Sequence, residues 1–398
     1  MKKKKNKWIR AQHKFMRNLI YMLVYPFAKL KYHIKIKKQK NVEQCLILSN
    51  HQTAFDQFFI SFAFKQHVYY VASEDLFSMG WVSRFIKWAV APIPIKKQTT
   101  DLKAVKDCLR VAKEGGTIAI FPEGNRTFSG KTETIKKSIV KLIKALKLPI
   151  AFFKIEGGYG VQPRWSDKTR KGKMTAQVSK TIKPEEYLNL TDDQLYDLVK
   201  TELYVNEANS NNEFKSKHLA EYLERLVYVC PKCGIAEFES NKNIITCKKC
   251  GCTVEYLQTT QLKGINNDFV FSYVNDWYDY QEQYVHNLDL SQFNDKPCFT
   301  DTVALSEVAL YKNKTLINEN TTLMCYSNRF VVNDKVLNFS DITVTSVLGR
   351  NKLNIYYLDQ VLQIKGETRF NAVKYVNIFY HWKNLQQGND VDGKFLGL

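Results

Sequence analysis

The stretch LILSNHQTAFDQFF, residues 46–59, changes its pattern twice within a short distance. Leu46 to Leu48 belong to a continuous apolar run, which predicts a buried strand. A polar turn follows at Ser49 and Asn50, and the apolar residues that resume at residue 54 predict an amphipathic helix over 54–65. A strand that passes through a tight polar turn into a helix is a unit from which α/β folds are built.

The same alternation continues along the chain to about residue 153 and predicts a sheet covered by helices. Strands are predicted at 68–73, 91–95, 117–121 and 149–155, and helices at 81–89, 101–116 and 136–148. Less regular sequence follows, with one or two strands near 173–182 and helices at about 192–204 and 213–227. We therefore expect an α/β fold with a mostly parallel sheet flanked by helices.

His51 and Asp56 in the opening stretch form a candidate catalytic pair. Residues five apart lie about 140° apart around a helix axis, so the two side chains meet only if His51 lies on the turn and Asp56 on the helix. The carboxylate can then fix the imidazole tautomer, as an orienting group does for a general base. The spacing alone fits equally well a histidine bonded to a backbone carbonyl and an aspartate that starts a helix.

A second polar turn follows the predicted strand 117–121, in the sequence FPEGNRTFSGK. Pro122 and Gly124 shape this turn, and Arg126 offers a planar fork suited to phosphate. Glu123 can orient the arginine or bond a hydroxyl group. A nucleotide-binding loop is the alternative, but its pattern needs four residues between the glycines, and five stand here.

Four blocks of this sequence, in this order, resemble those of the glycerolipid acyltransferase family, which includes 1-acylglycerol-3-phosphate acyltransferases. They are NHQTAFD (50–56), EDLFSMGWVSRFIKWAVAPIPIKK (74–97), FPEGNRT (121–127) and LPIAFF (148–153). The chain departs from the family pattern at Ala91, where a glycine is usual, at Asn125 and Thr127, and in the two lysines that end the second block. These departures leave the head group of the acceptor open.

The resemblance implies a role for each matching residue. His51 would be the base that takes the proton of a lysophospholipid hydroxyl, and Asp56 would orient it. The implied substrate-binding residues are Asn50, Lys96, Lys97, Glu123, Gly124 and Arg126. The implied reaction transfers a fatty acyl group from a thioester, coenzyme A or carrier protein, to 1-acylglycerol-3-phosphate to give phosphatidate, with no organic cofactor.

The chain has 9 cysteines, and 5 of them lie between residues 230 and 252. Cys230 and Cys233 form one C-x2-C pair, Cys247 and Cys250 form a second, and Cys252 is a spare. Four cysteines in this spacing are typical of a zinc ribbon, in which four thiolates hold a structural ion. We therefore expect zinc as a structural metal without a catalytic role.

The N-terminal 40 residues combine basic and apolar side chains. A run of ten apolar residues, 19–28, is flanked on both sides by lysine and arginine. A membrane-spanning helix needs about 20 apolar residues, and the basic residues after the run argue against a secretory signal. We expect an amphipathic segment in the membrane interface, or alternatively a basic tail with a buried helix. The apolar side of the segment would contain Trp8, Ile9, Phe15, Ile20 and Leu23.

The whole chain carries 59 lysines and arginines against 39 acidic residues, a net charge of +20. Such a charge indicates an anionic partner, and the N-terminal segment favours an anionic bilayer over nucleic acid. We expect a peripheral or monotopic membrane protein on the cytoplasmic face, whose partners are a lysophospholipid acceptor and an acyl thioester donor. Nothing in the sequence indicates an oligomeric state.

Five segments are expected. They are the membrane-interface segment 1–40, an acyltransferase domain 41–228, the zinc ribbon 229–258, a helical linker 259–298 and a C-terminal β domain 299–398. Short alternating strands and a final helix give the last segment a likeness to pleckstrin-homology domains. The alternative function is a nucleic-acid- or protein-binding zinc ribbon with an inactive acyltransferase-like domain, in which the catalytic residues would be expected to be lost.

Overall fold

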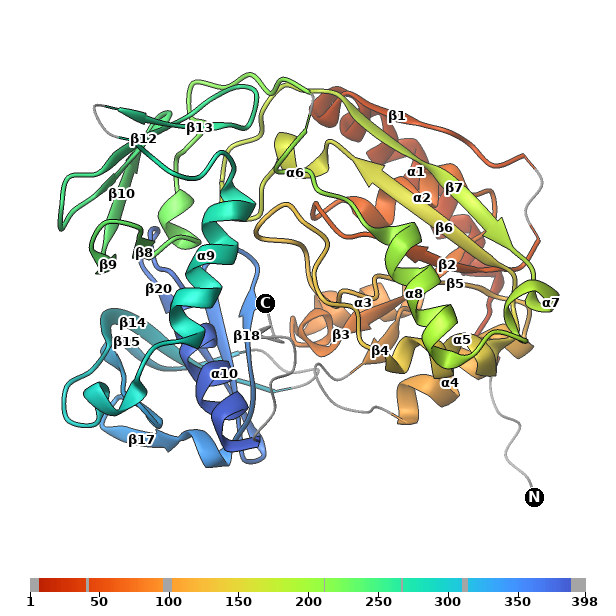
Figure 1. The fold of residues 1–398 in the computed structure, drawn as a ribbon. Helices are drawn as coiled ribbons and strands as arrows, with labels where there is room; N and C mark the ends of the chain where they lie inside the picture. The colour runs from red at the N-terminus through yellow and green to blue at the C-terminus, as the bar shows by residue number, and fades with distance from the viewer. Residues whose placement is uncertain are drawn as a thin grey trace. The chain divides into compact units, whose positions relative to one another are not determined.

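The structure is a computed structural model that describes residues 7–40, 43–95, 102–210, 212–265, 268–309 and 314–387. The chain divides into two compact units, which are shown together in Figure 1. Unit 1 comprises Met1–Thr127, Lys131–Val161 and Lys171–Glu207, and unit 2 comprises Phe128–Gly130, Gln162–Arg170 and Ala208–Leu398. The five segments expected from the sequence are finer than these units, and their bounds stay a prediction.

Unit 1 is built on a seven-stranded sheet in the order β1-β7-β6-β2-β5-β3-β4 (Figure 1). All of its pairs are parallel except β6 with β7, which are antiparallel. The α/β fold with a mostly parallel sheet is therefore confirmed, with a reversed edge at β7 and β1. The strands are β1 (Ile34–Ile36), β2 (Leu46–Ser49), β3 (Val68–Ser73), β4 (Ile93–Ile95), β5 (Thr117–Ile120), β6 (Ile150–Glu156) and β7 (Met174–Ile182).

Helices cover both faces of this sheet. Helix α5 contacts α4 on one side and α8 on the other. Helix α4 packs on β4 and β5, and α8 packs on β6. Helices α1 and α2 contact each other and the reversed edge of the sheet. Strand β2 is buried at all four residues because both of its faces are covered. The helices are α1 (Ala11–Tyr32), α2 (Asp56–Ala63), α3 (Trp81–Val90), α4 (Leu102–Lys113), α5 (Ser138–Leu146), α6 (Gly158–Val161), α7 (Pro184–Tyr187) and α8 (Asp192–Leu203).

The N-terminal segment differs from the prediction in one respect. Trp8 and Ile9 precede α1 and pack against the core of unit 1, with the indole N–H of Trp8 donating to the carbonyl of Ala91. They therefore do not share a membrane-facing side with Phe15 and Leu23, which are exposed on α1. Among the helices that the structure describes, none combines the length and apolar character needed to cross a bilayer.

The first part of unit 2 holds the cysteine-rich region. A short hairpin, β8 with β9, precedes a four-stranded antiparallel sheet in the order β10-β11-β12-β13. Helix α9 (Val274–His286) follows. The strands are β8 (Val229–Cys230), β9 (Gly234–Ile235), β10 (Phe238–Asn241), β11 (Ile244–Cys247), β12 (Thr253–Tyr256) and β13 (Leu262–Ile265).

The second part of unit 2 is a seven-stranded antiparallel sheet in the order β17-β16-β15-β14-β20-β19-β18, followed by α10 (Val373–Gln387). The predicted C-terminal β domain closed by a helix is therefore present, and its likeness to pleckstrin-homology domains stays a prediction. Its strands are β14 (Phe299–Val308), β15 (Thr315–Cys325), β16 (Arg329–Val332), β17 (Lys335–Asn338), β18 (Ile342–Leu348), β19 (Lys352–Tyr357) and β20 (Gln360–Gly366).

The prediction of a helix at 213–227 is wrong. Within these residues the structure has only a short 3-10 turn, Leu223–Arg225. Backbone N–H groups that would bond within a helix donate instead to the β10–β11 hairpin. The N–H of Ala220 donates to the carbonyl of Lys242, and that of Tyr222 to Oγ of Ser240. The apolar residues that suggested a helix are buried in the core of unit 2.

Candidate active site and metal centre

The predicted catalytic pair forms at the carboxyl end of β2. His51 lies on the turn after this strand, and Asp56 is the first residue of α2. Nδ1 of His51 and Oδ2 of Asp56 are 2.8 Å apart. The side chain of His51 is 19% exposed and that of Asp56 is 0% exposed. The imidazole therefore reaches solvent, while the carboxylate that bonds it is enclosed.

A set of local donors holds the Asp56 carboxylate in place. Oδ2 accepts the backbone N–H groups of Gln52 and Thr53 at 2.6 and 2.9 Å, and Oδ1 accepts the Thr53 hydroxyl at 2.6 Å. A carboxylate oxygen can only accept hydrogen bonds, so Nδ1 of His51 carries the proton in the bond to Asp56. The lone pair of the neutral imidazole then lies on Nε2, which is the atom that can act as a base.

The loop after β5 is joined to the His51 turn by three contacts. The Phe121 ring stacks on the imidazole with 4.1 Å between the ring centroids. Oε1 of Glu123 accepts the backbone N–H of His51 at 2.8 Å, and the carbonyl of His51 accepts the N–H of Thr127 at 3.0 Å. The structure thus brings the two polar turns predicted from the sequence together around His51.

Glu123 is buried, and both of its carboxylate oxygens accept hydrogen bonds from backbone N–H groups. Its second oxygen, Oε2, accepts the N–H of Glu133 at 2.9 Å. Burial raises the pKa of the Glu123 carboxyl well above its usual range, and the two backbone donors act in the opposite direction. The geometry therefore favours a role in positioning His51 over the predicted contact with substrate.

Asn50 has a similar framework role. It is 1% exposed, and its amide both donates to the carbonyl of Ile155 at 2.8 Å and accepts the N–H of Ile155 at 2.9 Å. These bonds tie the end of β2 to β6 and favour a structural role over the predicted substrate contact.

Two of the four remaining predicted substrate-binding residues, Gly124 and Arg126, lie on the loop after β5. Gly124 is exposed, has a φ of +72° that favours glycine, and donates its N–H to the carbonyl of Phe121 at 3.0 Å, which closes the turn. Arg126 is half-buried and directly precedes Thr127, whose N–H contacts His51. Lys96 and Lys97 lie outside the described residues. The roles of all four in substrate binding stay predictions.

Two residues at the site were missed by sequence reasoning. Thr53 stands three residues before Asp56, a spacing similar to the capping box at helix N-termini, and that pattern could have identified it. Phe121 gave no such signal, because its stacking on His51 depends on strands β2 and β5 being neighbours in the sheet.

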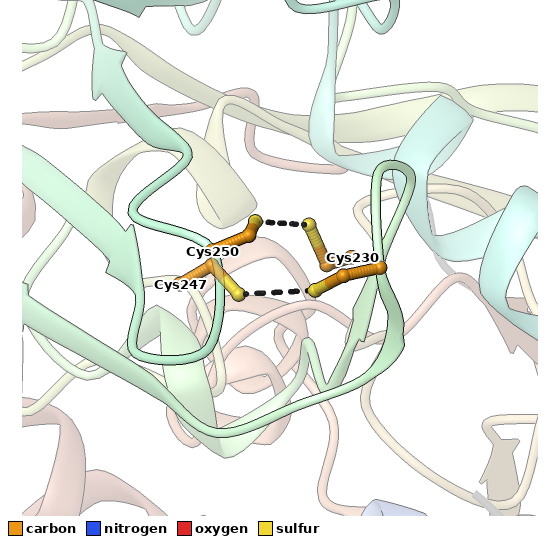
Figure 2. A group of neighbouring side chains, drawn as sticks. Cys230, Cys247 and Cys250 are labelled. Atoms are coloured by element: carbon orange, nitrogen blue, oxygen red, sulfur yellow. Dashed lines mark hydrogen bonds between the residues drawn. The ribbon is translucent and has the colours of Figure 1, made fainter.

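The four predicted metal-ligating cysteines also converge. Their sulfur atoms all lie within 4.8 Å of one another, and the pairs Cys230–Cys250 and Cys233–Cys247 are each 3.6 Å apart. Figure 2 shows Cys230 on one segment of the chain and Cys247 and Cys250 on another, with their side chains directed towards the space between the two segments. Four sulfurs at about 2.3 Å from a tetrahedral zinc ion would be about 3.8 Å apart, so these four cysteines fit a metal ion.

Part of unit 1 is similar in sequence to known acyltransferases. Residues 31–154 match the sequence model of a family described as Acyltransferase. The chain is 23% identical over 123 residues to the 1-acyl-sn-glycerol-3-phosphate acyltransferase of Bacillus subtilis, covering 31% of this chain and 58% of the relative. It is 22% identical over 166 residues to the chloroplastic 1-acyl-sn-glycerol-3-phosphate acyltransferase BAT2 of Brassica napus, covering 41% and 47%. The chain thus spans about half the length of these curated relatives.

A solved structure was also compared, that of the 1-acyl-sn-glycerophosphate (LPA) acyltransferase PlsC from Thermotoga maritima. It is 17% identical, with a TM-score of 0.39, covering 48% of this chain and 74% of that one. The matched residues 31–154 contain His51, Asp56 and the loop that carries Arg126. Through this region the chain matches the acyltransferase family model and is similar to 1-acyl-sn-glycerol-3-phosphate acyltransferases.

Proposed function

We propose that the protein transfers an acyl group from a thioester to the hydroxyl of a lysophospholipid, most directly 1-acylglycerol-3-phosphate, which gives phosphatidate. The observation that carries this proposal is the pair His51–Asp56, 2.8 Å apart at the carboxyl end of β2. Open α/β sheets bind their ligands at this edge. Coenzyme A or a carrier protein would deliver the acyl group.

The proposed reaction needs one base and no covalent enzyme intermediate. Nε2 of His51 takes the proton of the acceptor hydroxyl while the oxygen attacks the thioester carbonyl carbon. The C–S bond then breaks, and the departing thiolate receives the proton from the imidazolium. Asp56 stabilises the imidazolium between the two transfers, and Glu123 and Phe121 hold the imidazole in position.

Arg126 is proposed to bind the phosphate of the acceptor, together with Lys96 or Lys97. We expect Arg126→Ala to raise the KM for 1-acylglycerol-3-phosphate by about tenfold or more, because a charge-assisted bidentate contact is lost. The measurement is steady-state acyl transfer with coenzyme A and carrier-protein thioesters as donors.

A monoacylglycerol, which lacks the phosphate, is the matched control acceptor. Arg126→Ala should change the KM for the monoacylglycerol little, because this acceptor has no phosphate for Arg126 to bind. An equal loss with both acceptors would contradict the phosphate role of Arg126, and no transfer to any lysophospholipid by the wild type would contradict the proposed function. The alternative of a binding protein with an inactive domain would gain support from that second result.

Membrane association is proposed to occur through α1 and α3, which pack against each other. Large apolar side chains on both helices are exposed, and lysine and arginine stand among them, as in helices that lie in an anionic membrane interface. The exposed apolar residues are Phe15, Met22, Leu23, Phe27 and Leu30 of α1 and Trp81, Phe85 and Trp88 of α3. The cytoplasmic face is the proposed location.

The double variant Leu23→Glu/Phe27→Glu is expected to weaken binding to vesicles of phosphatidylcholine and phosphatidylglycerol by more than about tenfold. Each side chain contributes roughly 1.5–3 kcal/mol when it leaves water. Vesicle flotation measures the bound fraction. Leu109→Glu, on the exposed side of α4, is the control, and an equal loss in both variants would contradict this docking surface.

Zinc is proposed as the ion held by Cys230, Cys233, Cys247 and Cys250, with a structural role. Four thiolates leave no open coordination position for substrate. The residues that carry the proposed acyl transfer belong to unit 1, and the four cysteines belong to unit 2.

A further inference from the structure

One face of the C-terminal sheet carries three lysines close together, which we call the lysine cluster: Lys314, Lys352 and Lys365. Lys352 on β19 and Lys365 on β20 are direct partners in the antiparallel register, so their side chains leave the same face of the sheet. Lys314, just before β15, donates from Nζ to Oε1 of Gln363 at 3.2 Å. Gln363 is two residues from Lys365 on β20 and therefore lies on the same face.

The three lysines of this cluster lie close enough for their charges to act on one another. Burial lowers the pKa of the Lys314 ammonium, and the charges of Lys352 and Lys365 lower it further. Within the part of the chain that the structure describes, none of the three lysines makes an ion pair with a carboxylate. Like charges directly opposite each other destabilise a sheet, so an anion bound at this face would relieve a cost that the fold carries.

A row of buried polar side chains lies beside the lysines on the same face. Register places Ser346, Asn354, Gln363 and Ser306 next to one another across β18, β19, β20 and β14. All four are at most 6% exposed. Nε2 of Gln363 donates to Oδ1 of Asn354 at 3.1 Å, which fixes the amide that faces Lys314.

Ser346 is the member of the row that lacks a partner. Its Oγ is buried and makes no hydrogen bond to the residues that the structure describes. A buried hydroxyl left unpaired costs free energy, whereas a hydroxyl that donates to a bound anion does not. The row thus adds an unpaired hydroxyl group to the face of the sheet from which Lys352 and Lys365 project.

We propose that the lysine cluster and Ser346 form a binding site for a phosphate group, carried by a lipid head group or by a soluble phosphate compound. Ammonium groups bind phosphate as point charges, and the three here come from two neighbouring strands, β19 and β20, and from the residue just before β15. The site lies in unit 2, and its existence does not depend on the proposed acyl transfer.

The test is titration of the full chain with inorganic phosphate at constant ionic strength, followed by calorimetry and by the rise in melting temperature. The variant is Lys352→Gln/Lys365→Gln, and the control is Lys296→Gln/Lys335→Gln, which removes the same charge from exposed lysines of the same unit. We expect phosphate affinity to fall at least about fivefold in the first variant and to be unchanged in the control. Arg126→Ala, which removes the phosphate ligand proposed in unit 1, should leave this binding event intact.

Flotation with vesicles of phosphatidylcholine containing one tenth phosphatidate distinguishes the source of the phosphate. Loss of vesicle binding in Lys352→Gln/Lys365→Gln, but not in the control, supports a lipid head group. Lysine-dependent binding of inorganic phosphate without an effect on vesicles supports a soluble compound. The proposal is overturned if both variants bind phosphate and vesicles alike, or if only Arg126→Ala abolishes phosphate binding.

Discussion

Replacing His51 with alanine is expected to reduce kcat for acyl transfer by about 10³-fold or more, with little change in the melting temperature. The side chain is partly exposed and its bonds are made to Asp56 and to neighbouring loops, so its removal takes away the proposed base without opening the core. A positioned general base contributes about 10²–10⁴-fold. The measurement is kcat and KM for 1-acylglycerol-3-phosphate with a fixed thioester donor.

Asp56→Asn separates the role of the carboxylate from that of the base. The amide can still accept the N–H groups of Gln52 and Thr53, but it no longer stabilises a protonated imidazole. We expect a fall in kcat of about 10²–10⁴-fold and a lower melting temperature, because Asp56 is fully buried.

The control for the base is His33→Asn. His33 is exposed at the end of α1 with a φ of +47°, a conformation that asparagine tolerates. This variant should keep wild-type kcat. If His51→Ala retained more than about a tenth of the wild-type kcat, His51 would not be the base.

The sequence predicted the position of this pair because the information is local. The apolar run to Leu48 and the helical pattern after residue 54 define the strand and the helix, and the interval between them sets His51 on a turn and Asp56 on the helix. The sequence also predicted that the loop carrying Arg126 lies near His51. The carboxyl ends of neighbouring parallel strands share one edge of a sheet, and both polar turns follow such strands.

The hydrogen-bond partners of the site residues could not be predicted in the same way. Glu123 and Asn50 stand in motifs that suggested substrate contact, yet their polar atoms bond backbone groups of His51, Glu133 and Ile155. Those partners are distant in sequence and are defined only once β2, β5 and β6 are aligned. A motif thus located the site without separating residues that face substrate from residues that hold the framework.

Local sequence patterns also could not predict which segments of the chain make up unit 2. Residues 162–170 interrupt the sequence of unit 1 but belong to unit 2, where Trp165 is buried in the core. Arg225 donates to both carboxylate oxygens of Asp167 at 2.9 Å and to the carbonyl of Trp165. These contacts explain why residues near 220 adopt an irregular backbone, since their partners come from distant segments.

Removing the proposed zinc is expected to unfold the cysteine-rich part of unit 2. Cys230 and Cys247 are fully buried in the same core as Trp277 and the C-terminal sheet, and strands β8 and β9 are too short to be stable alone. Structural zinc contributes roughly 10–16 kcal/mol of apparent binding free energy in small zinc domains. Purified protein should hold about one equivalent of zinc. A chelator should lower the melting temperature and weaken the near-ultraviolet circular dichroism of the protein, because aromatic side chains of this core, Trp277 among them, lose their fixed packing.

Single replacements test which thiols hold the ion. Cys247→Ser should abolish stoichiometric zinc and reproduce the effect of the chelator, because a hydroxyl replaces a thiolate in a closed four-sulfur site. Cys252→Ser is the matched control, since Cys252 is also buried in this core but lies outside the four-sulfur cluster. It should retain zinc and most of the stability. Less than half an equivalent of zinc in wild-type protein purified without chelator, or equal loss of zinc in both variants, would show that these four cysteines do not form the metal site. The residues proposed to bind substrate lie in unit 1 and the four cysteines in unit 2. We therefore expect any zinc-free protein that stays folded to have the same KM for acyl transfer as the zinc-bound protein.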